Sequence, residues 1–313
     1  MNKIVTNDVL MIRPHRFGIN VEAAVDKTER VYVDVPARAV ASTALRQFDF
    51  LANHLEHKGI CVYMIQDDER LDTPGAVFAP HTFCTNGRPE LYFFPMRDHS
   101  RRMELIKFRT RISDLCQALS GDTPLTIHDL SDSDEPLEGL GSIVHDPYTK
   151  IAFCARSSRS DERLFRRYCD SRGYEPVMFS TDDTGRPIPH TNRMLSICEH
   201  LAFVCLDLLP DAVERKRLTE ALAAGNKVVI DMDPGQMKAF GTCCIELGKQ
   251  RGKSLLVFSK RGFQSLTDNQ KMLIYKYNDI LYADIGMFEQ YAGNGINSMI
   301  APMYLMHGTG SGL

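Results

Sequence analysis

Apolar positions along the chain follow two spacings. Short apolar runs, for example at residues 9–12, 60–65 and 91–94, are typical of strands, and the runs at 9–12 and 60–65 are expected to be buried. Between such runs lie longer stretches in which apolar residues step by three and four, as Leu45, Phe48, Ala52 and Leu55 do. This spacing predicts helices with one apolar face. Strands and helices therefore alternate along the chain, which indicates the α/β class.

Local signals place five main helices at regular intervals. Their starts lie near residues 39, 100, 160, 210 and 267, so that neighbouring starts are 50 to 61 residues apart. Ser100 is positioned to cap the second helix, and Thr267 and Gln270 have the spacing of a capping box at the fifth. Gly59 and Gly225 stand where the first and fourth helices should end.

Each of the five stretches carries the same order of elements, strand, strand, helix, strand, without visible sequence repetition. Such a pattern predicts five equivalent units in a ring. One helix beside a small sheet cannot bury all the apolar strand surface, so the units should share a core around an axis. The first and last strands should meet where the ring closes. Residues 1–305 are predicted to form this single domain, and residues 306–313 a flexible tail.

Composition narrows the function classes. The 313 residues are 43% hydrophobic and 25% charged, with a formal net charge of -3 and no basic stripe, which argues against nucleic acid as a partner. No apolar run is long enough for a membrane span, and the N-terminus lacks the apolar segment of a signal peptide. The sequence therefore predicts a soluble, cytoplasmic protein with no membrane partner.

Cysteine and histidine spacing gives no metal or disulfide framework. The nine cysteines are odd in number, include no CxxC pair and lie mostly in apolar surroundings, so reduced and mostly buried thiols are expected. His54 and His57 lie three residues apart on a predicted helix, but no third ligand is nearby and a surface pair is the better interpretation.

Four polar segments flanked by glycine or proline fall at equivalent places in the repeated units. They are Leu71–Phe78, Leu137–Ser142, Ile188–Asn192 and the Gly293–Ser298 stretch. If the units form a ring, these segments converge on its axis and are the candidate site. For each one an ordinary turn is the alternative, since glycine, asparagine and proline are common in turns. Apolar residues 76–78 within the first segment are predicted to be a strand.

These segments resemble the superfamily of enzymes that modify guanidino groups, which includes arginine deiminases, dimethylargininases and amidinotransferases, and most closely its citrulline-utilisation hydrolase-like branch. The motifs span nearly the whole chain and are Met11–Pro14, Thr73–Phe78, Pro95–Met96 with Arg101–Glu104, Leu137–Ser142, His190–Asn192, Ser259–Gln270 and Gly293–Ala301. Their order and spacing together are specific, although none is decisive alone. The resemblance implies a five-bladed α/β propeller, in agreement with the five repeated units.

The resemblance also implies roles for individual residues. Glu138 would hold the substrate guanidinium, His190 would be the general acid and base, and Ser298 would occupy the place of the nucleophilic cysteine. Arg159 would hold a substrate carboxylate, with a solvated loop arginine as the alternative. The remaining substrate-binding candidates are Asp72, Asn192, Gly293 and Asn297. No metal or organic cofactor is implied.

The chemistry of a guanidinium explains these residue types. Its carbon is deactivated by resonance, so hydrolysis needs a strong nucleophile and a proton for the leaving amine. In the family a thiolate attacks to give a covalent thiouronium intermediate, and a histidine serves the leaving amine and then water. Carboxylates orient the cation through paired hydrogen bonds. The expected partner is a small guanidino or ureido molecule such as arginine, a methylated arginine or citrulline.

The chain departs from the family pattern at several positions. Gly75 stands where an aspartate is usual, His81 lies within Pro80–Thr82 where Asn-Asn-Trp is usual, and Asn297 replaces an arginine before the nucleophile. A serine at position 298 is either an engineered Cys→Ser change or natural. A natural serine indicates altered chemistry or a catalytically inactive protein that binds an arginine-like ligand. Amidino transfer is a further alternative, and a homodimer is left open.

Overall fold

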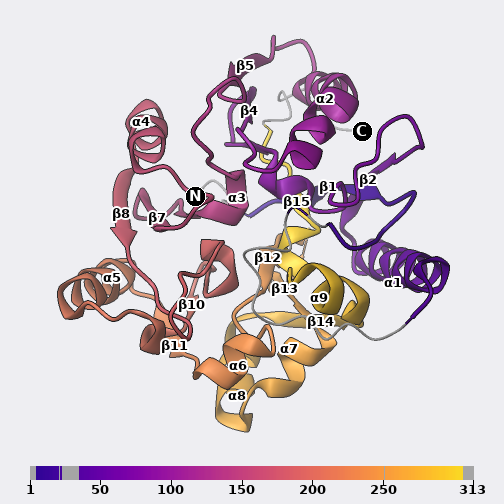
Figure 1. The fold of residues 1–313 in the computed structure, drawn as a ribbon. Helices are drawn as coiled ribbons and strands as arrows, with labels where there is room; N and C mark the ends of the chain where they lie inside the picture. The colour runs from indigo at the N-terminus through magenta and orange to yellow at the C-terminus, as the bar shows by residue number, and fades with distance from the viewer. Residues whose placement is uncertain (1–4, 21, 23–34, 250, 306–313) are drawn as a thin grey trace.

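The computed structural model describes residues 5–20, 22, 35–249 and 251–305. The predicted tail at 306–313 lies outside this range. In the described residues fifteen strands form five separate sheets of three strands each. Figure 1 shows the five sheets around a common centre with the long helices outside them. The prediction of an α/β fold with five repeated units is therefore confirmed.

All five sheets have the same internal topology. The central strand pairs in parallel with one neighbour and antiparallel with the other. In order, the sheets contain β15 (Ala301–Pro302), β1 (Asp8–Arg13) and β2 (Cys61–Gln66); β3 (Phe83–Thr85), β4 (Glu90–Phe93) and β5 (Thr126–Asp129); β6 (Ile143–Asp146), β7 (Ile151–Ala155) and β8 (Glu175–Phe179); β9 (Leu195–Ile197), β10 (Leu201–Val204) and β11 (Val228–Asp231); β12 (Ile245–Leu247), β13 (Leu255–Ser259) and β14 (Asp279–Ala283).

The first sheet combines the two ends of the described chain. Val9 of β1 pairs with Pro302 of β15, and Leu10 pairs with Ala301. The prediction that the first and last strands meet is confirmed by this pairing. The first and last strands of the described residues thus lie in one sheet.

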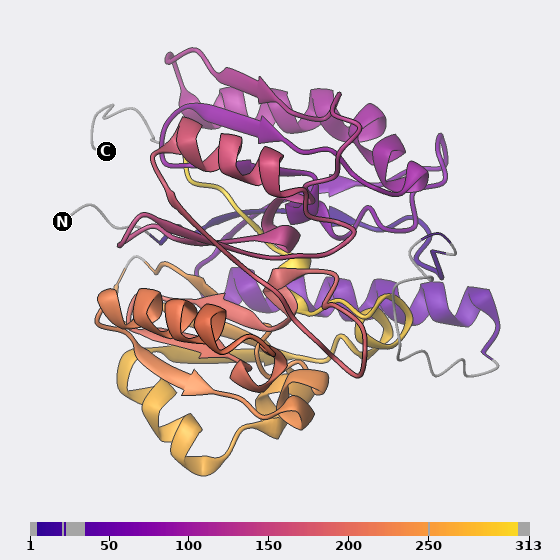
Figure 2. The same ribbon diagram turned by 60° about the vertical axis from the view of Figure 1, so that its left-hand side comes forward.

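One long helix connects the parallel strands of each sheet, because a parallel pair needs a crossover connection. These helices are α1 (Ala37–His57), α2 (His99–Ser120), α4 (Glu162–Arg172), α5 (Ala212–Ala224) and α8 (Asp268–Tyr277). All five begin within two residues of the positions predicted from sequence. Figure 2 shows α2 and α4 on one side of the molecule and α5 and α8 on the opposite side.

Shorter helical segments complete the described fold. The short α-helices are α3 (Gly139–Ser142), α6 (Pro234–Lys238), α7 (Lys260–Ser265) and α9 (Gly286–Ala292). The 3-10 turns are η2 (Ala79–His81), η3 (Thr191–Arg193), η4 (Leu206–Leu208) and η5 (Ile296–Ser298).

The helix caps agree with the sequence in most places. Thr267 and Gln270 form both hydrogen bonds of the predicted capping box, and the Asp211 side chain caps α5. The prediction for Ser100 is wrong, since α2 begins at His99 and Asp98 is the N-cap residue. Ser100 lies in the first turn, where its N–H and hydroxyl both donate to the Glu22 carboxylate.

Two strand predictions need correction. Residues 76–78 are apolar and buried but form a turn rather than a strand, because the Ala76 N–H donates to the Thr73 carbonyl and the Phe78 N–H to that of Gly75. The run at 60–65 is a strand as predicted but is not buried. It forms β2 at the edge of its sheet, where Cys61 and Met64 are exposed.

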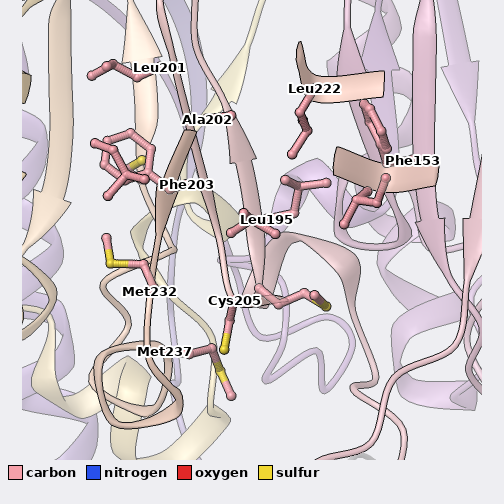
Figure 3. Close-up of a cluster of buried hydrophobic side chains, with 14 of the residues drawn as sticks. Phe153, Leu195, Leu201, Ala202, Phe203, Cys205, Leu222, Met232 and Met237 are labelled. Carbon is pink, nitrogen blue, oxygen red and sulfur yellow. The ribbon is translucent and has the colours of Figure 1, made fainter. Parts of the chain in front are cut away.

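The core is shared between neighbouring sheets. One large cluster combines residues of β7, β9, β10 and β13 with α5, and a second joins β1, β13 and β14 to α1 and α9. Figure 3 shows part of the first cluster, with Leu195 between Phe153 and Leu222 on one side and Phe203 and Met232 on the other. Of the nine thiols, all free, only that of Cys61 is exposed, in agreement with the prediction of reduced, mostly buried cysteines.

Among the described helices, none combines the length and the apolar composition that crossing a bilayer requires.

Candidate active site

Four short helical turns, each directly before the first strand of a sheet, supply the candidate site. They are η2 before β3, α3 before β6, η3 before β9 and η5 before β15. Their positions are equivalent in the repeated units, so side chains distant in sequence come together. His81, Glu138, His190, Asn192 and Ser298, which lie in or beside these turns, are each at most 5% exposed.

Ser298 is the residue on which the turns converge. Its Oγ lies 3.1 Å from Nε2 of His81, and the Asn192 side-chain amide donates to the same oxygen at 3.1 Å. Asn297 is held beside it, because its amide donates to the Asn192 carbonyl at 2.9 Å. The hydroxyl of Ser298 is therefore fixed by side chains of two other units.

A second pair consists of Glu138 and His190. Nε2 of His190 lies 2.6 Å from one carboxylate oxygen of Glu138. The other oxygen accepts from the Arg159 guanidinium at 2.8 Å and from the Arg97 N–H at 3.2 Å. Burial alone raises the pKa of Glu138, but the charge of Arg159 and the contact with His190 outweigh it, so its pKa lies well below the usual range. Glu138 is therefore a carboxylate at neutral pH.

The two histidine rings lie side by side because two glycines make room for them. Their centroids are 4.5 Å apart. A Cβ on Gly141 would lie 3.0 Å from ring atoms of both His81 and His190. A Cβ on Gly139, whose φ is +41°, would lie 2.7 Å from the carbonyl oxygens of Pro80 and His81. The Leu137–Ser142 motif thus needs glycine for close packing of η2 against α3.

The three groups His81, Glu138 and His190 present potential metal-ligand atoms within 4.8 Å of one another. Two histidines and one carboxylate could in principle hold a transition metal. However, both oxygens of Glu138 already contact cationic or N–H donors, and His190 is only 2.6 Å from one of them. A metal ion would have to break that contact and would lie near the Arg159 charge. The geometry therefore favours proton transfer over metal binding.

Comparisons with known proteins identify the family of this chain. A family profile described as eukaryotic N,N-dimethylarginine dimethylhydrolase matches residues 13–305. The chain belongs to this family. It thereby falls within the guanidino-modifying superfamily, and the family consists of hydrolases that act on carbon–nitrogen bonds of guanidino compounds. A search of curated proteins finds no match.

Solved structures show the same fold at low sequence identity. The N-terminal domain of ArgZ, an arginine dihydrolase from cyanobacteria, gives a TM-score of 0.73 at 12% identity over 95% of this chain and 98% of that chain. A dimethylarginine dimethylaminohydrolase gives 0.66 at 13% identity over 96% and 100%. AgrE in complex with L-arginine gives 0.73 at 14% identity, over 96% of this chain and 41% of that chain.

Most of the residues predicted from sequence come together. Ser298, Asn192 and Asn297 are in contact, and His190, Glu138 and Arg159 form the neighbouring cluster. Gly293 lies in the same segment as Ser298. It ends α9 with a φ of 62°, and its carbonyl accepts a hydrogen bond from Arg193.

The remaining two residues of this set are Arg159 and Asp72. Arg159 is not a solvated loop arginine, since it is 2% exposed and its guanidinium contacts Glu138 at 2.8 Å and Asp98 at 2.9 Å; its contact with a substrate carboxylate stays a prediction. Its positive charge is used to hold two buried carboxylates. Asp72 is exposed and lines a separate cavity of about 270 Å³ with His15 and Arg16, outside the Ser298 cluster.

Gly75, where the family usually has aspartate, is explained by its neighbours. A Cβ there would lie 2.7 Å from Cδ of Arg101 and 2.8 Å from Oε1 of Glu104. The side chains of these two residues of α2 are buried in contact, with 2.7 Å between Nε and Oε1, and Arg101 also donates to the Phe78 carbonyl. The Arg101–Glu104 pair therefore occupies the space beside Gly75 and anchors the turn that leads to His81.

Gly295 has a different reason to be glycine, and this gives a prediction. A Cβ there would lie 2.3 Å from Cβ of Cys243, which cannot rotate away. Gly295→Ala is expected to lower the free energy of unfolding by about 1–3 kcal/mol through overpacking. It should also displace Ser298, which follows three residues later. Urea unfolding would measure the loss; Gly18→Ala, where no atom lies within 4 Å, is the control. Equal stability of the two variants would contradict the prediction.

Glu104 leads to a prediction about pH. Burial raises the pKa of Glu104 to about 8, against the opposing effect of Arg101. Between about pH 4.5 and 8 the folded state therefore holds a proton that the unfolded state has released. Stability must fall as pH rises through this window, by up to about 1.4 kcal/mol per pH unit.

The variant that tests this pH dependence is Glu104→Gln, which keeps the shape of the side chain and removes its titration. Its free energy of unfolding should rise relative to the native chain between pH 5.5 and 7.5, as measured by urea unfolding at several pH values. Glu56→Gln, at an exposed position on α1, is the control and should leave the pH dependence as it is. Parallel curves for Glu104→Gln and the native chain would show that Glu104 does not titrate here.

In the sequence His81 stands out only as a departure from the family pattern. Because residues 76–78 are predicted to be a strand, the sequence points to Leu71–Phe78 as the site segment of this unit. The signal that could have found it is positional, because Pro80–Thr82 directly precedes β3 as Thr191–Arg193 precedes β9. Asp98 and the Arg101–Glu104 pair carry no such signal, since only the packing of α2 brings them to the site.

Proposed function

We propose that the chain hydrolyses a carbon–nitrogen bond of a small guanidino or ureido compound such as arginine, a methylated arginine or citrulline. The observation that carries this proposal is the pairing of a fixed, buried Ser298 hydroxyl with a neighbouring His190–Glu138 pair. Nucleophile and proton donor are the two groups that the reaction needs. The family match and the arginine-handling enzymes of the same fold support the substrate class.

In the proposed mechanism Ser298 attacks the central carbon and His190 protonates the leaving amine. His190 then takes a proton from water, which discharges the covalent intermediate. With serine the intermediate is an isouronium ester, whereas a cysteine at this position would give a thiouronium. Glu138 orients His190 and stabilises its protonated form, while Arg159 fixes Glu138. This differs from the guanidinium-holding role inferred from sequence, because both Glu138 oxygens already have protein partners.

The substrate would be held by groups around Ser298. The amide of Asn192 contacts the hydroxyl, and the Asn297 amide lies beside it on the Asn192 carbonyl. Asp72 lines the separate cavity together with Asp67, Asp68 and Glu69, and it is proposed to attract the cationic substrate rather than to touch the reacting atoms. No metal or organic cofactor takes part in this mechanism.

The test is turnover of a panel containing arginine, its monomethyl and dimethyl derivatives, and citrulline. Mass spectrometry would detect the ureido product and the released amine, and an acid quench would detect an adduct on the Ser298 peptide. Release of ammonia or an amine supports the proposal when a ureido product forms from a guanidino compound or a carbamate forms from citrulline. Binding by calorimetry without turnover would contradict it.

A catalytically inactive ligand-binding protein is the second candidate, and Ser298 itself favours it. A hydroxyl is a much weaker acid than a thiol, whose ordinary pKa is about 8.5. Amidino transfer shares the first covalent step and differs in the group that discharges the intermediate. Adding glycine or lysine to the turnover assay distinguishes transfer from hydrolysis, since a transferred amidino group changes the mass of the acceptor.

We further propose that the five sheets form a five-bladed α/β propeller and that residues 1–305 are one domain. Core clusters shared between neighbouring sheets support this arrangement. A single cooperative transition on heating is expected. Two separate transitions would contradict the proposal, and sedimentation at several concentrations would test for a homodimer.

A further inference from the structure

We infer that His81 is the general base that activates Ser298, so that two histidines divide the proton transfers of the reaction. The inference rests on the proposed function for its substrate but on the geometry of Ser298 for its chemistry. Nε2 of His81 lies 3.1 Å from Oγ of Ser298, and both groups are fully enclosed, with exposed fractions of 0% and 1%. His81 thus touches the reacting oxygen.

The hydrogen bonds at Ser298 fix the direction of its proton. The side chains that contact the hydroxyl are the amide of Asn192 and the imidazole of His81. The Asn192 nitrogen can only donate, so it occupies a lone pair of Oγ. Of these two partners only Nε2 of His81 can accept the hydroxyl proton. His81 is then neutral at Nε2 and carries its ring proton at Nδ1, which is the tautomer that a base needs.

The neighbouring histidine, His190, is held in a different protonation state. Nε2 of His190 lies 2.6 Å from the Glu138 carboxylate, which is kept ionised by Arg159. A proton on His190 is stabilised by this contact, and this suits a donor to the leaving amine. The rings are 4.5 Å apart, so both histidines reach the same reacting carbon while they differ in protonation.

Two departures from the family pattern are explained together. The family resemblance places asparagine at position 81 and cysteine at position 298, whereas this chain has histidine and serine there. The two changed side chains are in direct contact. A thiol ionises readily and needs no separate base, whereas a serine hydroxyl requires one. A histidine at position 81 supplies the base that a serine at position 298 requires and a cysteine there does not.

The steps balance as follows. Oγ forms a bond to the guanidinium carbon as its proton passes to His81; His190 then gives its proton to the departing nitrogen as the C–N bond breaks. Water adds to the isouronium carbon and gives a proton to His190. The C–Oγ bond breaks and Oγ recovers its proton from His81. The proton left on the ureido product passes to the released amine, and both histidines return to their initial states.

The first test measures the reactivity of Ser298 without any guanidino substrate. A small fluorophosphonate would be incubated with the native chain, and labelling of the Ser298 peptide would be followed by mass spectrometry. His81→Asn is expected to slow labelling at least about 100-fold, in line with the loss of a general base. His57→Asn, an exposed histidine at the end of α1, is the control and should label at the native rate. Equal labelling in His81→Asn, or no labelling of the native chain, would overturn the inference.

The second test separates a base from a merely structural residue. His81→Asn would be combined with Ser298→Cys, and turnover of the four variants compared. The loss caused by His81→Asn should be about 100-fold or more with serine and less than about tenfold with cysteine, because the thiol does not need the base. Equal losses in both backgrounds would show that His81 only supports the fold. His81→Gln is the second variant if His81→Asn fails to fold, as judged by circular dichroism.

The two tests keep the inference separate from the proposed function. Fast labelling of Ser298 that depends on His81, without turnover of any guanidino compound, would support the base and refute the proposed reaction. Turnover of a guanidino compound that is insensitive to His81→Asn would support the proposed reaction and refute the role of His81 as the base.

Discussion

Ser298→Ala is expected to lower kcat/KM for the guanidino substrate by about 10⁴-fold or more, because the variant has no atom that can form the covalent intermediate. Ligand affinity should change little, since the Asn192 amide, His190 and Glu138 remain in place. Steady-state turnover and calorimetry on the same preparation measure the two effects. Ser42→Ala, an exposed hydroxyl on α1, is the control.

The pattern of outcomes for Ser298→Ala distinguishes the candidate functions. Loss of turnover with retained binding would agree with nucleophilic catalysis. Retained turnover would mean that water attacks directly and that Ser298 only binds substrate. Loss of both would indicate that the hydroxyl holds the turns together, so the melting temperature of the variant should be compared with that of the native chain.

Arg159→Met is expected to lower the free energy of unfolding by about 3–5 kcal/mol, the cost of leaving buried charge uncompensated. Arg159 lies between Glu138 and Asp98, which are 0% and 7% exposed. Methionine fills a similar volume but offers no charge. Glu138 should then bind a proton more readily, and the variant should lose activity together with stability. Urea unfolding at neutral pH measures the main effect.

The control for Arg159→Met is Arg166→Met. Arg166 pairs with Glu162 one turn away on α4, and its side chain is 48% exposed. An exposed pair of this kind contributes less than about 1 kcal/mol. If both substitutions lower the free energy of unfolding by the same amount, the Arg159 cluster contributes no more than a surface ion pair. The role of Arg159 in holding Glu138 would then be wrong.

Local pattern was sufficient for most elements of the fold. Helix starts follow from side chains within one turn, such as Thr267 and Gln270, and their effect does not depend on the rest of the chain. The same local reasoning failed at residues 76–78, where an apolar, buried run is a turn. Gly75 forms that turn against Arg101 and Glu104, which belong to a later helix. Exposure of β2 was missed for a related reason, since only the sheet order makes it an edge strand.

The contacts of the site, like the fold, could be predicted from the sequence only in part. Ser298, His190 and Glu138 could be named from motifs, and the repeated units suggested that they converge. Their partners could not be named, because a contact such as His81 with Ser298 joins residues 217 positions apart. Arg159 is the clearest example of a residue whose contacts could not be predicted. Its motif indicated a cation near the substrate, but its burial between two carboxylates depends on the packing of α2 against the 157–160 loop.

The sequence by itself determined the five repeated units and the class of chemistry, and it supplied Ser298, His190 and Glu138 as candidate site residues, because periodicity and motif order are properties of the chain. Only the tertiary structure decided how charge and protons are distributed among them. It paired Glu138 with His190 and Arg159, and it placed His81 on Ser298. The physical reason is that burial and hydrogen bonding set the state of an ionisable group, and both depend on neighbours that the packing of five separate sheets brings together.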